Sequence, residues 1–108
     1  MTRYMIVRHK VKDYLQWRPV FDESEELRHE NGLGGGCICR DINDPTILTI
    51  TLRVLDLDKA REFGKSETLR DAMRRAGVLG EPTVFFAEEL AEVPELSVAA
   101  AEKSELHP

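Results

Sequence analysis

The opening of the chain constrains its fold more than any other stretch. Apolar and polar side chains alternate over Tyr4–Val11, which is typical of a β-strand with one buried face. Asp13 follows at once, and its carboxylate can accept hydrogen bonds from the free amides of a first helical turn. The sequence therefore predicts a strand that leads directly into a helix, with His9 near the end of the strand and on its apolar face.

The predicted helix has one apolar side. Its buried stripe recurs at helical spacing and consists of Tyr14, Trp17, Val20, Phe21, Ser24 and Leu27. The charged residues between them, Arg28 included, are expected on a solvated outer face. Pro19 removes one hydrogen bond within the helix, so we expect a bend or an irregular turn before Val20. Asn31 and Gly32 are typical of a helix C-terminus.

The glycine run Gly34–Gly36 does not match a phosphate-binding loop. A dinucleotide fingerprint requires a strand, then glycines, then a helix, whereas these glycines follow a helix and precede a strand. We expect a flexible or bulged start of the next strand.

Two strands follow, over Cys37–Asp41 and Ile47–Leu55, joined by a turn at Asn43–Pro45. The second strand has a wholly apolar face. Cys37 and Cys39 share one face of the first strand, and no second Cys or His cluster accompanies them. We expect two buried or half-buried thiols, because a free cysteine behaves as a small hydrophobe.

The second half of the chain repeats the helix-then-strand order. Asp56 or Asp58 is predicted to cap a helix that residues 64–66 interrupt, and Ser66 to cap its second segment. Gly77 is placed where a left-handed helix C-terminus is common. The last strand is expected over Thr83–Ala87.

This element order predicts an α+β, ferredoxin-like βαββαβ domain, with both helices on one face of a four-stranded antiparallel sheet. The other face, with Tyr4 and Ile6, is too apolar to remain uncovered, so we expect a symmetric homodimer. The domain is predicted over residues 1–90. Residues 91–108 are expected to form an acidic, Ala-rich tail that is partly helical around Leu96–Lys103.

Charge narrows the class of partner. The formal net charge is −5, which argues against nucleic acid or an anionic membrane surface as the main partner. No apolar run approaches the roughly 20 residues of a membrane span. The first residues carry no apolar stretch typical of a secretion signal, and we expect a cytoplasmic protein.

His9 is the best candidate for chemistry, because a neutral imidazole among apolar neighbours can act as a general base or orient a hydroxyl group. The alternative is a core histidine bonded to the backbone or to Asp13. Tyr14 and Trp17 could stack on a flat ligand, or simply form core. Arg53 could bind a carboxylate, or lie at an interface. The three histidines are too dispersed for spacing to define a metal site.

The sequence also resembles the dimeric α/β-barrel superfamily, which includes the antibiotic biosynthesis monooxygenase-like proteins. The resemblance covers roughly Tyr4 to Leu90. It rests on these residues: Val7-Arg8-His9, Asp13-Tyr14, Trp17, Phe21, Phe63, Leu69, Ala76-Gly77-Val78 and Pro82.

The resemblance implies a homodimeric barrel with a pocket between sheet and helices in each protomer. Members include cofactor-independent monooxygenases, haem-degrading enzymes, isomerases and cyclases. The haem-degrading subgroup uses an Asn in the first strand, which this chain lacks, and its only Trp is on the first helix.

Two classes of function therefore stay open. One is a small enzyme without cofactor or metal that acts on a hydrophobic or aromatic metabolite, as a monooxygenase or as a cyclase or isomerase, with His9 as acid or base. The other is a non-catalytic binding or interaction module whose pocket is filled by aromatic side chains. The predicted pocket residues are Tyr14, Trp17, Phe21, Phe63, Phe86 and Arg53.

Overall fold

The computed structural model describes residues 1–96. Within them the elements follow in the order β1 (Arg3–Val11), α1 (Tyr14–Glu23), α2 (Glu25–Glu30), β2 (Leu33–Arg40), β3 (Ile47–Val54), α3 (Leu57–Gly64), α4 (Glu67–Arg75) and β4 (Val78–Glu88). The predicted βαββαβ order is confirmed, with each helical region divided in two. The predicted tail lies outside the described residues from position 97 onward.

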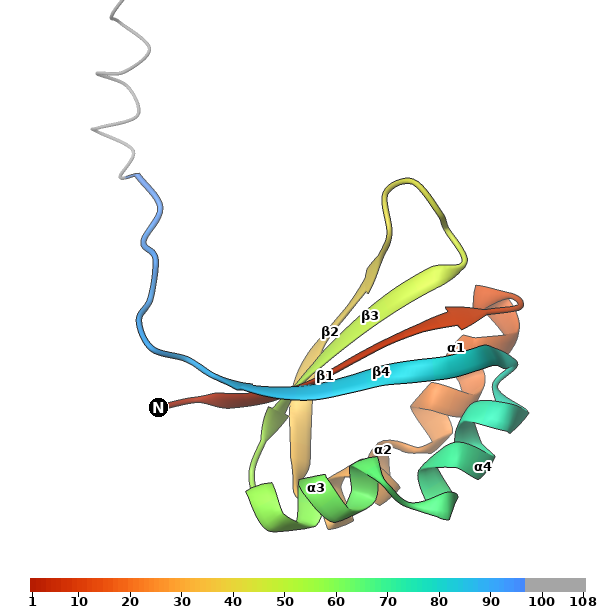
Figure 1. Cartoon of the computed structure of the whole chain (residues 1–108), viewed down its shortest axis with the longest axis horizontal. Coiled ribbons are helices and arrows are strands. Elements are labelled where there is room, and N and C mark those ends of the chain that lie inside the picture. Colours follow the sequence, from red (N-terminus) through yellow and green to blue (C-terminus); the bar gives the residue numbers. More distant parts are fainter. Residues whose placement is uncertain (97–108) are drawn as a thin grey trace, which may run out of the picture.

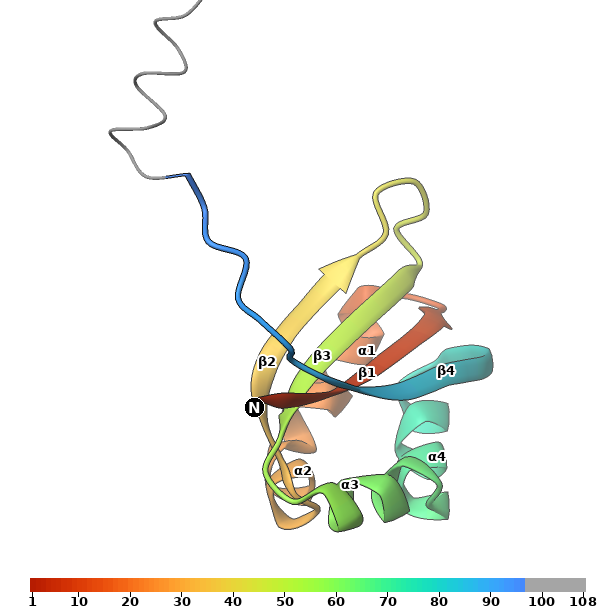
Figure 2. The same ribbon diagram turned by 60° about the vertical axis from the view of Figure 1, so that its left-hand side comes forward.

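The four strands form one antiparallel sheet in the order β2-β3-β1-β4. The register pairs His9 with Leu48, Val7 with Ile50, and Met5 with Leu52. All four helices lie on the same side of this sheet (Figures 1 and 2). The arrangement is the predicted ferredoxin-like one, and among residues 1–96 no element covers the opposite face of the sheet.

The core lies between the sheet and the helices. Met5, Leu48 and Leu33 are almost completely buried, with 1%, 0% and 1% of their surface exposed. Trp17 and Phe63 cover them from the helical side and belong to the same cluster. Burying side chains of this size contributes about 1.5–3 kcal/mol each to stability.

The first helix begins as predicted, because the Asp13 carboxylate accepts a hydrogen bond from the amide of Leu15 at 2.9 Å. Pro19 lies inside α1 and does not end it. The amide that Pro19 lacks would have bonded the carbonyl of Leu15, a residue that is 79% exposed and open to water. The break falls instead at Ser24, whose hydroxyl donates to the Val20 carbonyl at 2.8 Å. The predicted irregular turn before Val20 is therefore wrong.

The second helical region matches its predicted caps. The side chains of Asp56 and Ser66 each accept a hydrogen bond from a first-turn amide, at 3.1 Å in both cases. Gly77 adopts a φ of 80° just after α4. An L side chain is disfavoured there, so the glycine is required by the backbone.

Both edge strands are longer than predicted. β4 begins at Val78, because Val78 and Leu79 pair with the end of β1, and the register shifts between Arg8 and Lys10. Residues 80–82, which precede the predicted start of the strand at Thr83, thus form a bulge within it. β2 begins at Leu33 and shifts register between Leu33 and Gly36, which confirms the predicted bulged start.

The two cysteines are exposed, contrary to prediction. Cys37 pairs with Thr51 and Cys39 with Thr49, which places both thiols on the uncovered face of the sheet. One row across this face consists of Cys37, Thr51, Ile6 and Phe85. Phe85 is 47% exposed. Among the described residues, no helix is long and apolar enough to cross a membrane.

A candidate ligand pocket around His9

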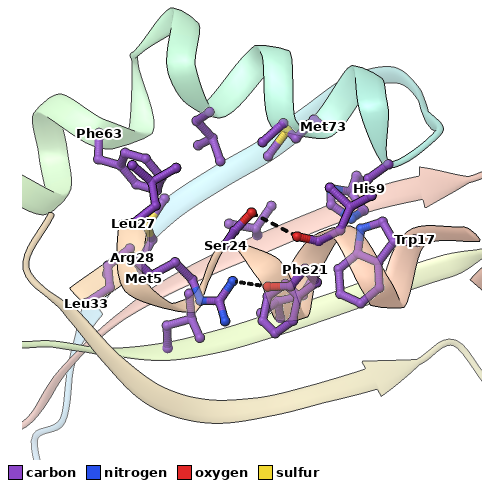
Figure 3. Close-up of a pocket in the computed structure, with 17 residues that line it drawn as sticks. Met5, His9, Trp17, Phe21, Ser24, Leu27, Arg28, Leu33, Phe63 and Met73 are labelled. Carbon is purple, nitrogen blue, oxygen red and sulfur yellow. Dashed lines mark hydrogen bonds between the residues drawn. The ribbon is translucent and has the colours of Figure 1, made fainter. Parts of the chain in front are cut away.

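A cavity of about 70 Å³ lies between the sheet and the helices. Strands β1 and β3 form its floor, and side chains from α1, α2, α3 and α4 form its walls (Figure 3). Nearly all of the lining is apolar, with Trp17, Phe21, Phe63 and Met73 among the larger groups. The polar side chains in the lining are His9, Ser24 and Arg28.

His9 is the buried polar group of the core. The strand period places its side chain on the helical face of β1, and only 6% of the residue is exposed. Neither ring nitrogen has a hydrogen-bond partner within the described part of the protein. The nearest aromatic contact is Trp17, edge to face, with centroids 5.8 Å apart and an interplanar angle of 71°. The alternative of a core histidine bonded to Asp13 or to the backbone is not what the structure shows.

Burial determines the charge of this histidine. Desolvation lowers the pKa of His9 from 6.5 to about 4, because the charged imidazolium loses its hydration in the apolar cavity. At neutral pH the ring is uncharged, so one nitrogen can donate a hydrogen bond and the other can accept one. A molecule that carries both a hydroxyl or carbonyl oxygen and an apolar body complements such a site.

An aromatic stack leads from the protein surface to His9. Tyr14 and Trp17 stack with centroids 5.9 Å apart, and Trp17 and Phe21 with centroids 4.8 Å apart. Trp17 and Phe21 line the cavity, whereas Tyr14 lies beyond it, where its hydroxyl accepts a hydrogen bond from Arg18 at 2.8 Å. The stack explains why these aromatics recur at helical spacing.

The structure brings together most of the predicted site residues. His9, Trp17, Phe21 and Phe63 line one cavity. Phe86 packs against the core cluster without lining the cavity. Arg53 pairs with Tyr4 on the uncovered face of the sheet. Because successive strand residues point to opposite faces, Arg53 does not reach a ligand held beside His9.

Arg28 is a cavity residue that the sequence analysis assigned to the solvated face. Its guanidinium lies 3.7 Å from the ring centroid of Phe21 and donates to the Phe21 carbonyl at 2.6 Å. Partial burial lowers the pKa of Arg28, which the nearby Glu25 and Asp22 carboxylates partly offset. Phe21 and Arg28 lie on either side of the break at Ser24, so their spacing in the sequence did not reveal this contact.

A second, larger hollow adjoins the cavity. Its volume is about 470 Å³, and it lies between α1, α2 and the glycine-rich start of β2. Four residues line both spaces: Phe21, Arg28, Leu33 and Leu52. The described residues contain no group of three or more His, Cys, Asp or Glu side chains placed to hold a metal ion.

These features define the class of protein: an α+β domain of ferredoxin-like topology with a histidine-containing interior pocket. No protein-family model and no curated protein sequence matches the chain. Solved structures do match it, at identities that establish the fold alone.

One similar structure is a protein from Bordetella bronchiseptica described as a candidate antibiotic biosynthesis monooxygenase, with a TM-score of 0.68 and 14% identity over 83% of this chain and 98% of that one. Another is SnoaB, a cofactor-independent oxygenase from Streptomyces nogalater, with a TM-score of 0.61 and 15% identity. The match covers 87% of this chain and 98% of SnoaB. A protein from Mycobacterium tuberculosis matches with a TM-score of 0.60 and 12% identity, over 87% of this chain and 100% of that one. The resemblance to the antibiotic biosynthesis monooxygenase-like proteins is thus confirmed at the level of fold.

Proposed function

We propose that this protein binds a small, largely apolar metabolite with an oxygen-bearing group, and that His9 contacts that oxygen. The observation that carries the proposal is the pair of unpartnered nitrogens on a buried imidazole that lines a cavity. Buried polar groups normally have partners, since an unsatisfied one costs about 1–3 kcal/mol. A bound ligand would supply the missing partner.

The reaction that we propose for this site is cofactor-independent oxygenation. His9 would accept a proton from an acidic CH₂ group next to a carbonyl or an aromatic ring, and the resulting carbanion would donate electrons to O₂. The net change converts R₂CH₂ and O₂ into R₂C=O and H₂O. The apolar walls exclude water from the carbanion, and the negative charge on the substrate would stabilise the imidazolium. The described activity of SnoaB on the same fold supports this reaction type.

The low proton affinity of His9 favours a second candidate, a binding module without catalysis. A histidine with a pKa of about 4 is a weak base, and in this second candidate its neutral ring only orients the ligand. A cyclase or isomerase would use the same proton transfer without O₂. The three alternatives differ in whether a substrate proton exchanges and whether O₂ is consumed.

The experiment uses 2-tetralone, a bicyclic ketone whose benzylic CH₂ is acidic. NMR of the histidine ring reports binding, loss of the CH₂ signal in anaerobic D₂O reports proton transfer, and an oxygen electrode reports oxygenation. Proton exchange together with O₂ uptake supports the oxygenase, and proton exchange without O₂ uptake supports the isomerase type. A shift of the His9 resonance with neither proton exchange nor O₂ uptake supports the binding module.

His9→Phe should abolish both rates, while Arg61→Gln, which removes an exposed charge on α3 away from both spaces, should leave them unchanged. A His9 resonance unmoved by any oxygen-bearing aromatic ligand would remove the basis of the proposal.

We further propose that the protein is a homodimer paired through the uncovered sheet face. The row that contains Ile6, Thr51 and the half-exposed Phe85 supports this, because such a face gains stability when a second copy covers it. The residue 1–90 domain boundary and the cytoplasmic location stay predictions.

A further inference from the structure

Arg28 is a half-buried cation without a carboxylate partner in the described part of the chain. Six ion pairs form among residues 1–96, and none includes Arg28. Of its several N–H donors, only one has an acceptor there, the Phe21 carbonyl. A partly desolvated cation is costly unless it is paired, so an anion in reach of the remaining donors would be bound with a net gain.

The guanidinium is held in a fixed orientation. Its central carbon lies 3.7 Å from the Phe21 ring centroid, and the hydrogen bond to the Phe21 carbonyl crosses the helix break at Ser24 (Figure 3). The side chain therefore loses little further freedom when it binds a ligand. Arg18 lines the same outer hollow but is already engaged with Asp22 at 2.8 Å and with the Tyr14 hydroxyl.

The glycines that begin β2, Gly34 to Gly36, line the space beside Arg28, and they bring no side chain into it. The outer hollow has about 470 Å³, whereas the inner cavity has about 70 Å³. The inner space admits only the narrow end of a ligand, since pockets for larger ligands have roughly 300–1,000 Å³. The remainder of the ligand must therefore occupy the outer hollow.

The register of the sheet sets the distance between the two polar groups. His9 pairs with Leu48, and Leu52 lies four residues further along β3. Arg28 belongs to the Leu52 end, because the outer hollow that it lines includes Leu52 and Leu33 but neither His9 nor Ile50. At about 3.3 Å per strand residue, the two positions are on the order of 13 Å apart along the strand.

We propose that the ligand of this site is an aromatic carboxylate, held at its carboxyl group by Arg28 in the outer hollow and at a distal hydroxyl or carbonyl oxygen by His9 in the inner cavity. This inference rests on the proposed function and adds the class of ligand to it. Glu25 also lines the outer hollow, and its carboxylate competes with the ligand for Arg28.

A purely structural role for Arg28 predicts a different effect of its removal on ligand binding. In that case the guanidinium only braces the break at Ser24, and its removal would weaken binding of charged and neutral ligands alike. The test therefore separates charge recognition from structure by varying the ligand and the residue together.

Three fluorescent probes serve as ligands: 6-hydroxy-2-naphthoate, 2-naphthoate without the hydroxyl, and 2-naphthol without the carboxylate. The wild type should bind 6-hydroxy-2-naphthoate about 10- to 100-fold more tightly than 2-naphthol, the range expected for a charge-assisted hydrogen bond. Arg28→Gln should remove that difference and leave 2-naphthol affinity unchanged. Arg61→Gln, a control at an exposed arginine on α3 that lines neither space, should change neither affinity, and Glu25→Gln should tighten carboxylate binding.

The outcomes separate this inference from the proposed function. Binding of 2-naphthol with a shift of the His9 resonance, but no gain from the carboxylate, overturns the role of Arg28 and leaves the His9 site in place. An equal loss for all three probes in Arg28→Gln, with an unchanged unfolding midpoint, also overturns it. If none of the probes binds at millimolar concentration, both proposals fail.

Discussion

The acid sensitivity of the fold should depend on His9. The pKa of His9 is lowered from 6.5 to about 4, so between these two pH values the unfolded chain binds a proton that the folded chain does not. Stability therefore falls as the pH drops below 6.5, and this loss is complete once the pH is below about 4. One pH unit corresponds to about 1.4 kcal/mol for one proton, which makes the total about 3 kcal/mol.

His9→Phe isolates this contribution. At pH 7.5 the variant should be about 1–2 kcal/mol more stable than the wild type, because two unpartnered buried nitrogens are replaced by an apolar ring that retains the edge contact with Trp17. At pH 4.5 the difference should have grown by roughly 2–3 kcal/mol.

Both stability differences, at pH 7.5 and at pH 4.5, can be measured by urea unfolding at several pH values between these two, with Trp17 fluorescence as the signal. Carboxylates such as Asp44 and Glu88, whose pKa values are lowered by Thr46 and Arg3, titrate in both proteins and cancel in the difference. His29→Gln is the control and should follow the wild type. A stability difference between wild type and His9→Phe that does not change with pH would refute the reasoning.

Three further predictions concern the backbone, a helix cap and the uncovered face. Gly36→Ala should unfold the protein or lower its unfolding temperature strongly, because the new Cβ would overlap the carbonyl oxygen of Thr51. Gly35→Ala should be nearly neutral in a thermal melt, because its Cβ would meet no atom within 4 Å. Asp13→Ala removes the cap of α1 and should cost about 1 kcal/mol in urea unfolding, and a loss below the error of the measurement would contradict the cap's role. Ile6→Glu places a charge in the proposed dimer interface and should give monomers in light scattering, so an unchanged dimer would count against that face.

The order of elements could be predicted from the sequence because its signals are local. Alternation over Tyr4–Val11, the cap at Asp13 and the glycine at Gly77 each report on a few neighbouring residues, and each was confirmed. Strand ends depend on pairing partners that are distant in sequence. The bulge near Leu33 was predicted from its glycines, whereas the irregularity that follows Val78 and Leu79 is visible only in the pairing of β4 with β1.

The candidate site was predictable in its apolar part and in His9. An imidazole on the apolar face of a strand must point into the core, and the structure places it there. Arg28 was missed because charged side chains on a helix are usually solvated. Its position depends on the break at Ser24, which no local pattern indicated. The cysteines were misplaced because the spacing shows that two residues share a face and does not show which face is covered.

The exposed pair Cys37 and Cys39 provides a native reporter of assembly. Their thiols are accessible in the single chain, and a hydrogen bond with Cys39 raises the pKa of Cys37, which slows the reaction of Cys37 at neutral pH. Covering the sheet face with a second copy would slow their labelling further. The rate at which a colorimetric thiol reagent modifies the unaltered protein across a dilution series would then follow the fraction of covered face, without any substitution in the interface.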